Sequence, residues 1–230
     1  MSTTTVTQPS YRQRLGYHAG LLGGICFLVS VMLIIGNMET NEEIQLHIEQ
    51  EKRATLAEVL PAALYDNEPL ADPVQLPQSG VFSAPVTIYT ATKHGSFSGA
   101  ALQSSVWGWG SDIQFIIAVD GKGEISGVRV ISHKETPGLA DKIEIEKDDW
   151  ITRFNGHSLS NTTEAQWHVK KDGGSFDQFT GATITPRAVV KGIHAALLVL
   201  EKWRLDKLAH PPIQSPDHNT SQPQSEETPQ

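Results

Sequence analysis

The chain contains 230 residues, 39% of them hydrophobic and 19% charged, which suits one globular core with appended segments. Its net charge of −8 at pH 7 argues against a nucleic-acid-binding protein, because neutralising phosphates requires a basic surface. Cys26 is the only cysteine, which excludes an intrachain disulfide, a cysteine-ligated iron–sulfur cluster and a CxxCH haem site. Any redox chemistry must therefore use an organic cofactor.

An uncharged segment near the N-terminus, from Leu15 to Met38, is the first element of the chain. About 20 helical residues span a hydrocarbon core of about 30 Å, so we predict a transmembrane helix over residues 17–38. A cleaved signal peptide is the alternative. It is disfavoured because the run is longer than the roughly 7–15 apolar residues typical of a signal peptide, and because no clean cleavage site follows.

The charges on either side of this segment predict its orientation. Arg12 and Arg14 precede the predicted helix, whereas Glu39 and Glu42 follow it. Because basic residues stay on the cytoplasmic side of a membrane, we expect residues 1–16 to be cytoplasmic and the rest of the chain to lie outside.

A stalk helix is predicted next, over residues 39–66, because apolar residues recur near helical spacing with charges between them. We expect it to end near Pro61, and it serves either as a connector packed on the domain or as a partner-binding helix. A proline-rich loop over residues 68–80 then leads to a strand-like run over residues 81–91.

Two β-rich runs follow, over residues 112–119 and 124–132, and the "DGKG" between them predicts a hairpin. "KDDWITRF" predicts a short helix with Asp148 or Asp149 near its start. We therefore expect one α+β domain over residues 67–208. The remaining residues, 209–230, are rich in proline and serine with almost nothing to bury, so we expect a disordered tail.

The stretch "TGATITP" shows how the last helix of the domain begins. Pro186 suits the first turn of a helix and Thr185 suits its N-cap. Unpaired N–H groups and the helix dipole at such an end favour a phosphate by about 0.3–1 kcal/mol, or up to about 2 kcal/mol when partly buried. Gly181 and Ala182 let the backbone approach a ligand closely. The pattern alone fits a capped turn as well as a ligand site.

Two segments together resemble one family. "DQFTGATITP" resembles the motif by which FMN-binding domains of respiratory complexes accept a flavin on a threonine hydroxyl, and "VISHKETPGLADKI" resembles a second element of the same family. Both lie in the family's order behind one N-terminal membrane span. Over residues 40–207 the chain is similar to the G subunits of Rnf (Rsx) electron-transport complexes. The family usually has glycine where Ala140 stands, so we expect a slightly different backbone there.

The resemblance implies an FMN joined by a phosphoester bond to Thr183, because the family carries its flavin on the threonine directly after Gly-Ala. Thr180 is the second candidate acceptor. A separate flavin transferase supplies the FMN in this family, so the resemblance implies no catalytic residue in the chain itself. Lys170 and Lys171 are expected to be a solvated charge pair rather than phosphate partners. The implied flavin-binding residues are Glu135, Thr136, Pro137, Gly138, Leu139, Thr180, Gly181, Ala182 and Thr185.

The alternative for residues 135–139 is a structural turn with Glu135 in solvent. The alternative for Thr180 and Thr185 is support of the turn and the helix cap. The nine histidines lack paired-ligand spacing, so we predict no metal site.

The function that the resemblance implies is a membrane-anchored flavoprotein subunit that relays electrons in a complex coupling electron transfer to ion translocation. It implies a place in the bacterial inner membrane with the main domain in the periplasm. The implied partners are the other Rnf subunits, the flavin transferase and membrane lipid, with no nucleic acid and no turnover by the chain alone. The alternatives are the C subunit of a sodium-translocating NADH:quinone reductase and a flavin-free membrane-anchored assembly protein.

Overall fold

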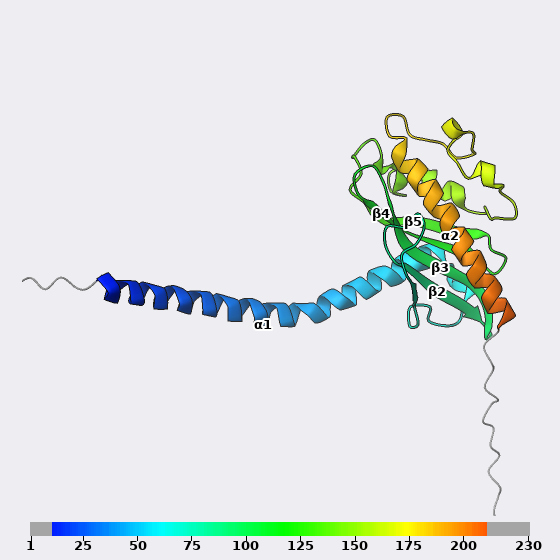
Figure 1. Cartoon of the computed structure of the whole chain (residues 1–230). Coiled ribbons are helices and arrows are strands. Elements are labelled where there is room, and N and C mark those ends of the chain that lie inside the picture. The colour runs from blue at the N-terminus through cyan, green and yellow to red at the C-terminus, as the bar shows by residue number, and fades with distance from the viewer. Residues whose placement is uncertain (1–10, 211–230) are drawn as a thin grey trace, which may run out of the picture. The chain divides into compact units, whose positions relative to one another are not determined.

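The computed structural model describes residues 11–210, with side chains described at residues 16–34 and 49–210 (Figure 1). The predicted cytoplasmic start and the predicted tail therefore lie largely outside the described residues. The chain divides into two compact units, Met1–Lys52 and Arg53–Gln230.

Helix α1 (Tyr11–Val59) supplies the first unit and reaches into the second. Its segment Gly16–Ile34 has a mean hydropathy of 2.0 and contains no buried residue, and it is long and apolar enough to cross a membrane. One continuous helix covers the predicted membrane segment and residues 39–59 of the predicted stalk, because no proline or glycine lies between Asn37 and Val59. It ends just before Pro61, which disfavours helical geometry at the preceding residue.

The second unit is built on a five-stranded antiparallel sheet with the strand order β1-β2-β3-β4-β5, so each strand pairs with its neighbours in sequence. This α+β architecture confirms the predicted fold class. The strands are β1 (Val74–Leu76), β2 (Val86–Lys93), β3 (Ser96–Trp107), β4 (Asp112–Asp120) and β5 (Ile125–Ser132).

Helix α2 (Ile184–Ala209) lies across one face of this sheet and buries its apolar stripe there (Figure 1). Fully burying one such aliphatic side chain contributes about 1.5–3 kcal/mol. Gly192 marks the closest approach, because a Cβ at this position would lie 2.7 Å from Val106 Cγ1 of β3. The other face of the sheet packs against Leu56, Val59 and Leu60, since successive strand residues point to opposite faces.

Short 3-10 helices, rather than regular secondary structure, connect β5 to α2. Their order is η2 (Asp141–Ile143), η3 (Asp149–Phe154), η4 (Glu164–Gln166) and η5 (Lys170–Asp172), while η1 (Ala62–Leu64) lies before the sheet. A buried aromatic cluster holds this segment. Phe154 stacks on Phe176 at 4.5 Å between ring centroids, and Trp150 donates its indole N–H to the Asp177 carbonyl at 2.8 Å.

Local signals in the sequence predict several of these elements. The hairpin around "DGKG" is confirmed as β4 and β5, and the short helix is confirmed as η3, with Asp148 accepting a hydrogen bond from Trp150 N at 2.9 Å. The interpretation of residues 68–80 as a loop is wrong in part, because β1 lies there. Strand β3 was not predicted, since its centre "SGAALQSS" is rich in small residues with little β-propensity.

Candidate functional site

The start of α2 differs from the sequence prediction. Thr183, not Thr185, is the N-cap residue, and helical geometry begins at Ile184. The Thr183 side chain makes no capping hydrogen bond, whereas the Thr183 carbonyl accepts the Arg187 N–H at 3.3 Å. Pro186 still lies in the first turn, where the N–H that it lacks would have no helical partner.

The three threonines of the motif lie in three different environments. Thr185 is fully buried and its hydroxyl donates to Glu135 Oε2. Thr180 is exposed, and Thr183 is half-buried at the helix start. Because the Thr185 hydroxyl is already engaged and out of reach of solvent, only Thr180 and Thr183 present a hydroxyl that could be modified.

The loop before α2 contacts the loop after β5. Gly181 adopts a left-handed conformation with φ +84°, which favours glycine. A Cβ at Gly181 would lie 3.8 Å from Leu139 Cδ2, so the two sequence motifs are in van der Waals proximity. The structure therefore brings the "TGAT" and "ETPGL" segments together, although about 40 residues separate them.

The predicted alternative of a solvated Glu135 is wrong, because this residue is only 5% exposed. Its carboxylate accepts the Trp109 N–H at 3.2 Å on Oε1 and 3.3 Å on Oε2, in addition to the Thr185 hydroxyl. A Cβ at Gly108 would lie 2.5 Å from Glu135 Oε1, so only glycine fits beside the carboxylate. Glu135 thus ties the β3–β4 turn to the start of α2 from beneath the surface.

The rest of the predicted "ETPGL" site faces solvent. Thr136, Pro137, Gly138 and Leu139 are all exposed, and the Thr136 carbonyl accepts the N–H groups of Leu139 at 3.2 Å and Ala140 at 3.0 Å. Gly138 has φ +76°, whereas Ala140 has φ −110° and ψ −11°. Ala140 therefore adopts an ordinary backbone conformation that needs no glycine.

Ion pairs hold the segment that leads into the threonine motif. Asp177 accepts from Arg153 Nη1 and from Lys170 Nζ, both at 2.6 Å. The Lys170 hydrogen bond, together with the nearby Lys170 and Arg153 charges, lowers the pKa of Asp177. Lys170 is therefore paired with Asp177, and the Lys171 N–H donates to Gln178 Oε1 at 3.1 Å. Neither observation assigns these lysines to a phosphate.

Sequence reasoning missed the β3–β4 turn, whose Trp107 and Trp109 side chains are 62% and 66% exposed. The signal that could have found it is the repeated Trp-Gly of "WGWGS", since large exposed aromatic side chains mark contact surfaces. Beside this turn and the start of α2 lies a cavity of about 330 Å³, a size suited to a small molecule. It is lined by Gly80, Val81, Val106, Trp107, Ile184, Arg187, Ala188 and Lys191.

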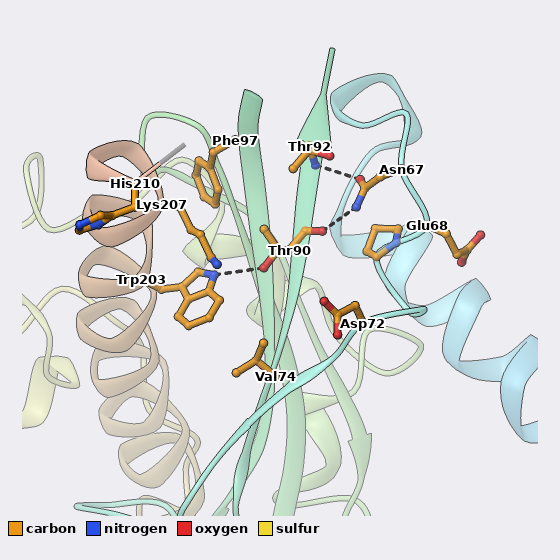
Figure 2. A pocket seen from close by; sticks show the side chains of 11 residues that line it. Asn67, Glu68, Asp72, Val74, Thr90, Thr92, Phe97, Trp203, Lys207 and His210 are labelled. Carbon is orange, nitrogen blue, oxygen red and sulfur yellow. Dashed lines mark hydrogen bonds between the residues drawn. The ribbon is translucent and has the colours of Figure 1, made fainter. Parts of the chain in front are cut away.

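A second cavity, of about 280 Å³, lies toward the C-terminal end of α2 (Figure 2). There Trp203 donates its indole N–H to Thr90 Oγ1 of β2 at 3.1 Å, and Lys207 Nζ lies 4.6 Å from the centroid of the Trp203 ring. None of the site residues predicted from the sequence lines this cavity. The candidate site is therefore at the other end of α2.

Comparison with known proteins decides the family. The model of the FMN-binding domain matches residues 108–198. A protein of Stutzerimonas stutzeri, named as the G subunit of an ion-translocating oxidoreductase complex, is 50% identical over 188 residues, covering 82% of each chain. The chain belongs to this G-subunit family. Relatives with the same name in Cereibacter sphaeroides and Pseudomonas aeruginosa are 46% and 44% identical, covering 86% and 82% of this chain and 90% of each relative.

The family assignment confirms the resemblance to the Rnf-type G subunits and favours it over the two alternatives. The matched residues 108–198 contain the β3–β4 turn, the "ETPGL" loop and the start of α2, which the structure brings together. The apolar segment of α1 and the family together indicate a membrane anchor. A crystal structure of NqrC from Shewanella oneidensis is 19% identical, with a TM-score of 0.39 over 64% of this chain and 74% of that chain, a likeness that decides nothing about function.

Proposed function

We propose that this chain is the flavin-carrying, membrane-anchored G subunit of an ion-translocating oxidoreductase complex, with FMN joined by a phosphoester bond to Thr183 Oγ1. One observation carries the attachment site. Thr183 is the residue of the motif that combines a half-buried position at the start of a long helix with a hydroxyl that makes no capping bond. Thr185 is excluded as the acceptor by its burial and its bond to Glu135.

Helix α2 supports a phosphate at this position. The first turn of a helix leaves N–H groups unpaired, and its dipole favours negative charge. A phosphate ester on Thr183 would lie at this end of the 26-residue helix. Thr180 is the weaker candidate, because it lies three residues earlier in an exposed loop and outside the helix start.

Exposed apolar side chains of the loop after β5 and of the start of α2 suit a planar aromatic ring. Leu139 and Ile184 are 46% and 50% exposed, and Trp107 lines the neighbouring cavity. A bound FMN would supply one- and two-electron transfer, while the protein orients it and adjusts its potential. The buried Glu135 carboxylate holds the β3–β4 turn and the start of α2 together through its bonds to Trp109 and Thr185. The residues proposed to hold the cofactor are Glu135, Thr136, Pro137, Gly138, Leu139, Thr180, Gly181, Ala182 and Thr185.

The proposed membrane arrangement rests on the charges that flank the apolar segment of α1, Gly16–Ile34. With Arg12 and Arg14 before the apolar segment, residues 1–16 are cytoplasmic and the second unit is periplasmic, in a bacterial inner membrane. The other subunits of the complex supply and remove electrons, and a flavin transferase attaches the FMN. The chain performs no turnover alone.

Flavin fluorescence of the denatured chain tests the attachment. The full-length parent chain and its Thr183→Val and Thr180→Val variants would each be produced together with a flavin transferase. Each protein would then be separated on a denaturing gel. We expect a fluorescent band for the parent and for Thr180→Val, and none for Thr183→Val, because valine keeps the shape and removes the oxygen. A non-fluorescent parent in the presence of the transferase would favour a flavin-free assembly protein.

A further inference from the structure

The His133 side chain is buried and is not among the predicted site residues. This residue follows directly after β5, and its side chain is only 8% exposed. Both ring nitrogens have partners. Nδ1 lies 3.0 Å from the backbone N of Glu135, and Nε2 lies 2.6 Å from Glu144 Oε1 at the end of η2.

These contacts determine where the imidazole carries its proton. A backbone N–H can only donate, so Nδ1 of His133 must be the acceptor and carries no hydrogen. The proton is therefore on Nε2, from which it is donated to the Glu144 carboxylate. Glu144 thus orients the ring so that its acceptor nitrogen points at Glu135.

The hydrogen bond from the Glu135 N–H to His133 fixes the Glu135 backbone. It offers no route for a proton to the Glu135 carboxylate. His133 contacts the N–H of Glu135, whereas the Glu135 carboxylate accepts from Trp109 and Thr185. An amide N–H does not pass a proton onward, so the imidazole has a geometric role. It holds the backbone from which the carboxylate reaches both the β3–β4 turn and the start of α2.

We propose that His133 is a positioning residue of the flavin site. Its Nδ1 fixes the Glu135 backbone, and Glu135 in turn holds the loop of residues 136–139 against the start of α2, where Thr183 lies. The proposal rests on the proposed FMN at Thr183. It adds a residue that does not touch the cofactor and acts on it through Glu135.

Two substitutions separate the two bonds of the imidazole. His133→Asn places an amide oxygen at the position of Nδ1 and can still accept the Glu135 N–H, but it loses the bond to Glu144. His133→Gln places an amide nitrogen near the position of Nε2 and can still donate to Glu144, but it loses the Glu135 bond. His157→Asn is the matched control, because this part-buried histidine contacts Thr162 Oγ1 at 2.6 Å.

The first measurement needs no cofactor. Hydrogen exchange of the Glu135 amide would be followed in the full-length, flavin-free chain in detergent, with fragmentation that resolves single residues. We expect parental protection in His133→Asn and His157→Asn, and at least tenfold faster exchange in His133→Gln. Equal protection of the Glu135 amide in His133→Gln and in the parent would overturn the proposal. If His133→Gln does not fold, a folded His133→Asn chain in which the Glu135 amide has lost its protection would overturn the proposal.

The second measurement is the reduction midpoint of the flavin in the loaded chain. We expect His133→Gln to change the reduction equilibrium about tenfold, which is about 30 mV for a two-electron couple, while His133→Asn stays at the parental value. Equal shifts in both variants, or no shift in either, would reduce His133 to a packing residue and overturn the proposal. A parental chain that carries no flavin would instead refute the proposed function. The exchange of the Glu135 amide is measured without flavin, so it still tests the role of His133 in that case.

Discussion

Replacing Thr185 by valine tests the bond between the helix start and the buried Glu135. Valine keeps the shape of threonine, and Thr185 is fully buried, so the substitution removes the hydroxyl donor and little else. Glu135 Oε2 retains only the Trp109 N–H, at 3.3 Å. Hydrogen bonds to charged groups contribute about 1.5–3 kcal/mol, so we expect the unfolding free energy to fall by about 2 kcal/mol.

The native fluorescence of the chain makes this loss measurable without removing the membrane helix. All five tryptophans lie at or after Trp107, so tryptophan emission reports on the second unit alone. In thermal unfolding of the full chain in detergent, about 2 kcal/mol corresponds to a decrease of about 4–8 °C in the midpoint for a domain of this size. Thr180→Val, at an exposed position, is the control and should stay within about 0.5 kcal/mol of the parent.

Two results would refute this reasoning. A Thr185→Val chain as stable as the Thr180→Val control would show that the bond to Glu135 does not hold the helix start. A Thr185→Val chain that folds but loses its covalent flavin would show that Thr185 takes part in attachment, contrary to its burial. We expect instead a less stable chain with normal flavin occupancy.

Three further predictions concern packing, pH and topology. Gly108→Ala should destabilise the second unit, because its Cβ would lie 2.5 Å from Glu135 Oε1, and unaltered thermal unfolding would contradict this. Burial lowers the pKa of His194, so the unfolded chain binds a proton at this residue before the folded chain does as the pH falls below about 6.5. Urea titrations should therefore show that the unfolding free energy falls from pH 7 to pH 5. The decrease should be smaller in His194→Gln. The lowered pKa of Asp177 acts in a separate window, with its stabilisation present above about pH 4 and lost as the pH falls through the folded pKa. A protease on the periplasmic face should remove the second unit from intact spheroplasts, and protection until lysis would reverse the orientation.

The parts of the fold that the sequence predicts are those with strong local signals. "DGKG" determines a hairpin between neighbouring strands, and an uncharged run of sufficient length predicts the apolar part of α1. Strand β3 lacks such a signal, because its small residues are in the sheet through pairing with β2 and β4 rather than through their own propensity.

The site shows the same division. The segments "TGAT" and "ETPGL" are visible in the sequence through resemblance, and the structure brings them into contact. The role of Glu135 could not be predicted, because its partners Thr185 and Trp109 are 50 and 26 residues away in the chain. The N-cap was misplaced for a related reason. The Thr185 hydroxyl, which could have capped the helix, is drawn to the Glu135 carboxylate instead.

Locating the flavin on the chain by mass spectrometry tests the central claim most directly. Cleavage after Lys171 and Arg187 yields the peptide Asp172–Arg187, which contains Thr180, Thr183 and Thr185. In chain produced with the flavin transferase, we predict that this peptide carries the mass of FMN less one water, and that electron-transfer fragmentation assigns this mass to Thr183. The added mass on Thr180 or Thr185, or its absence from the peptide, would contradict the account.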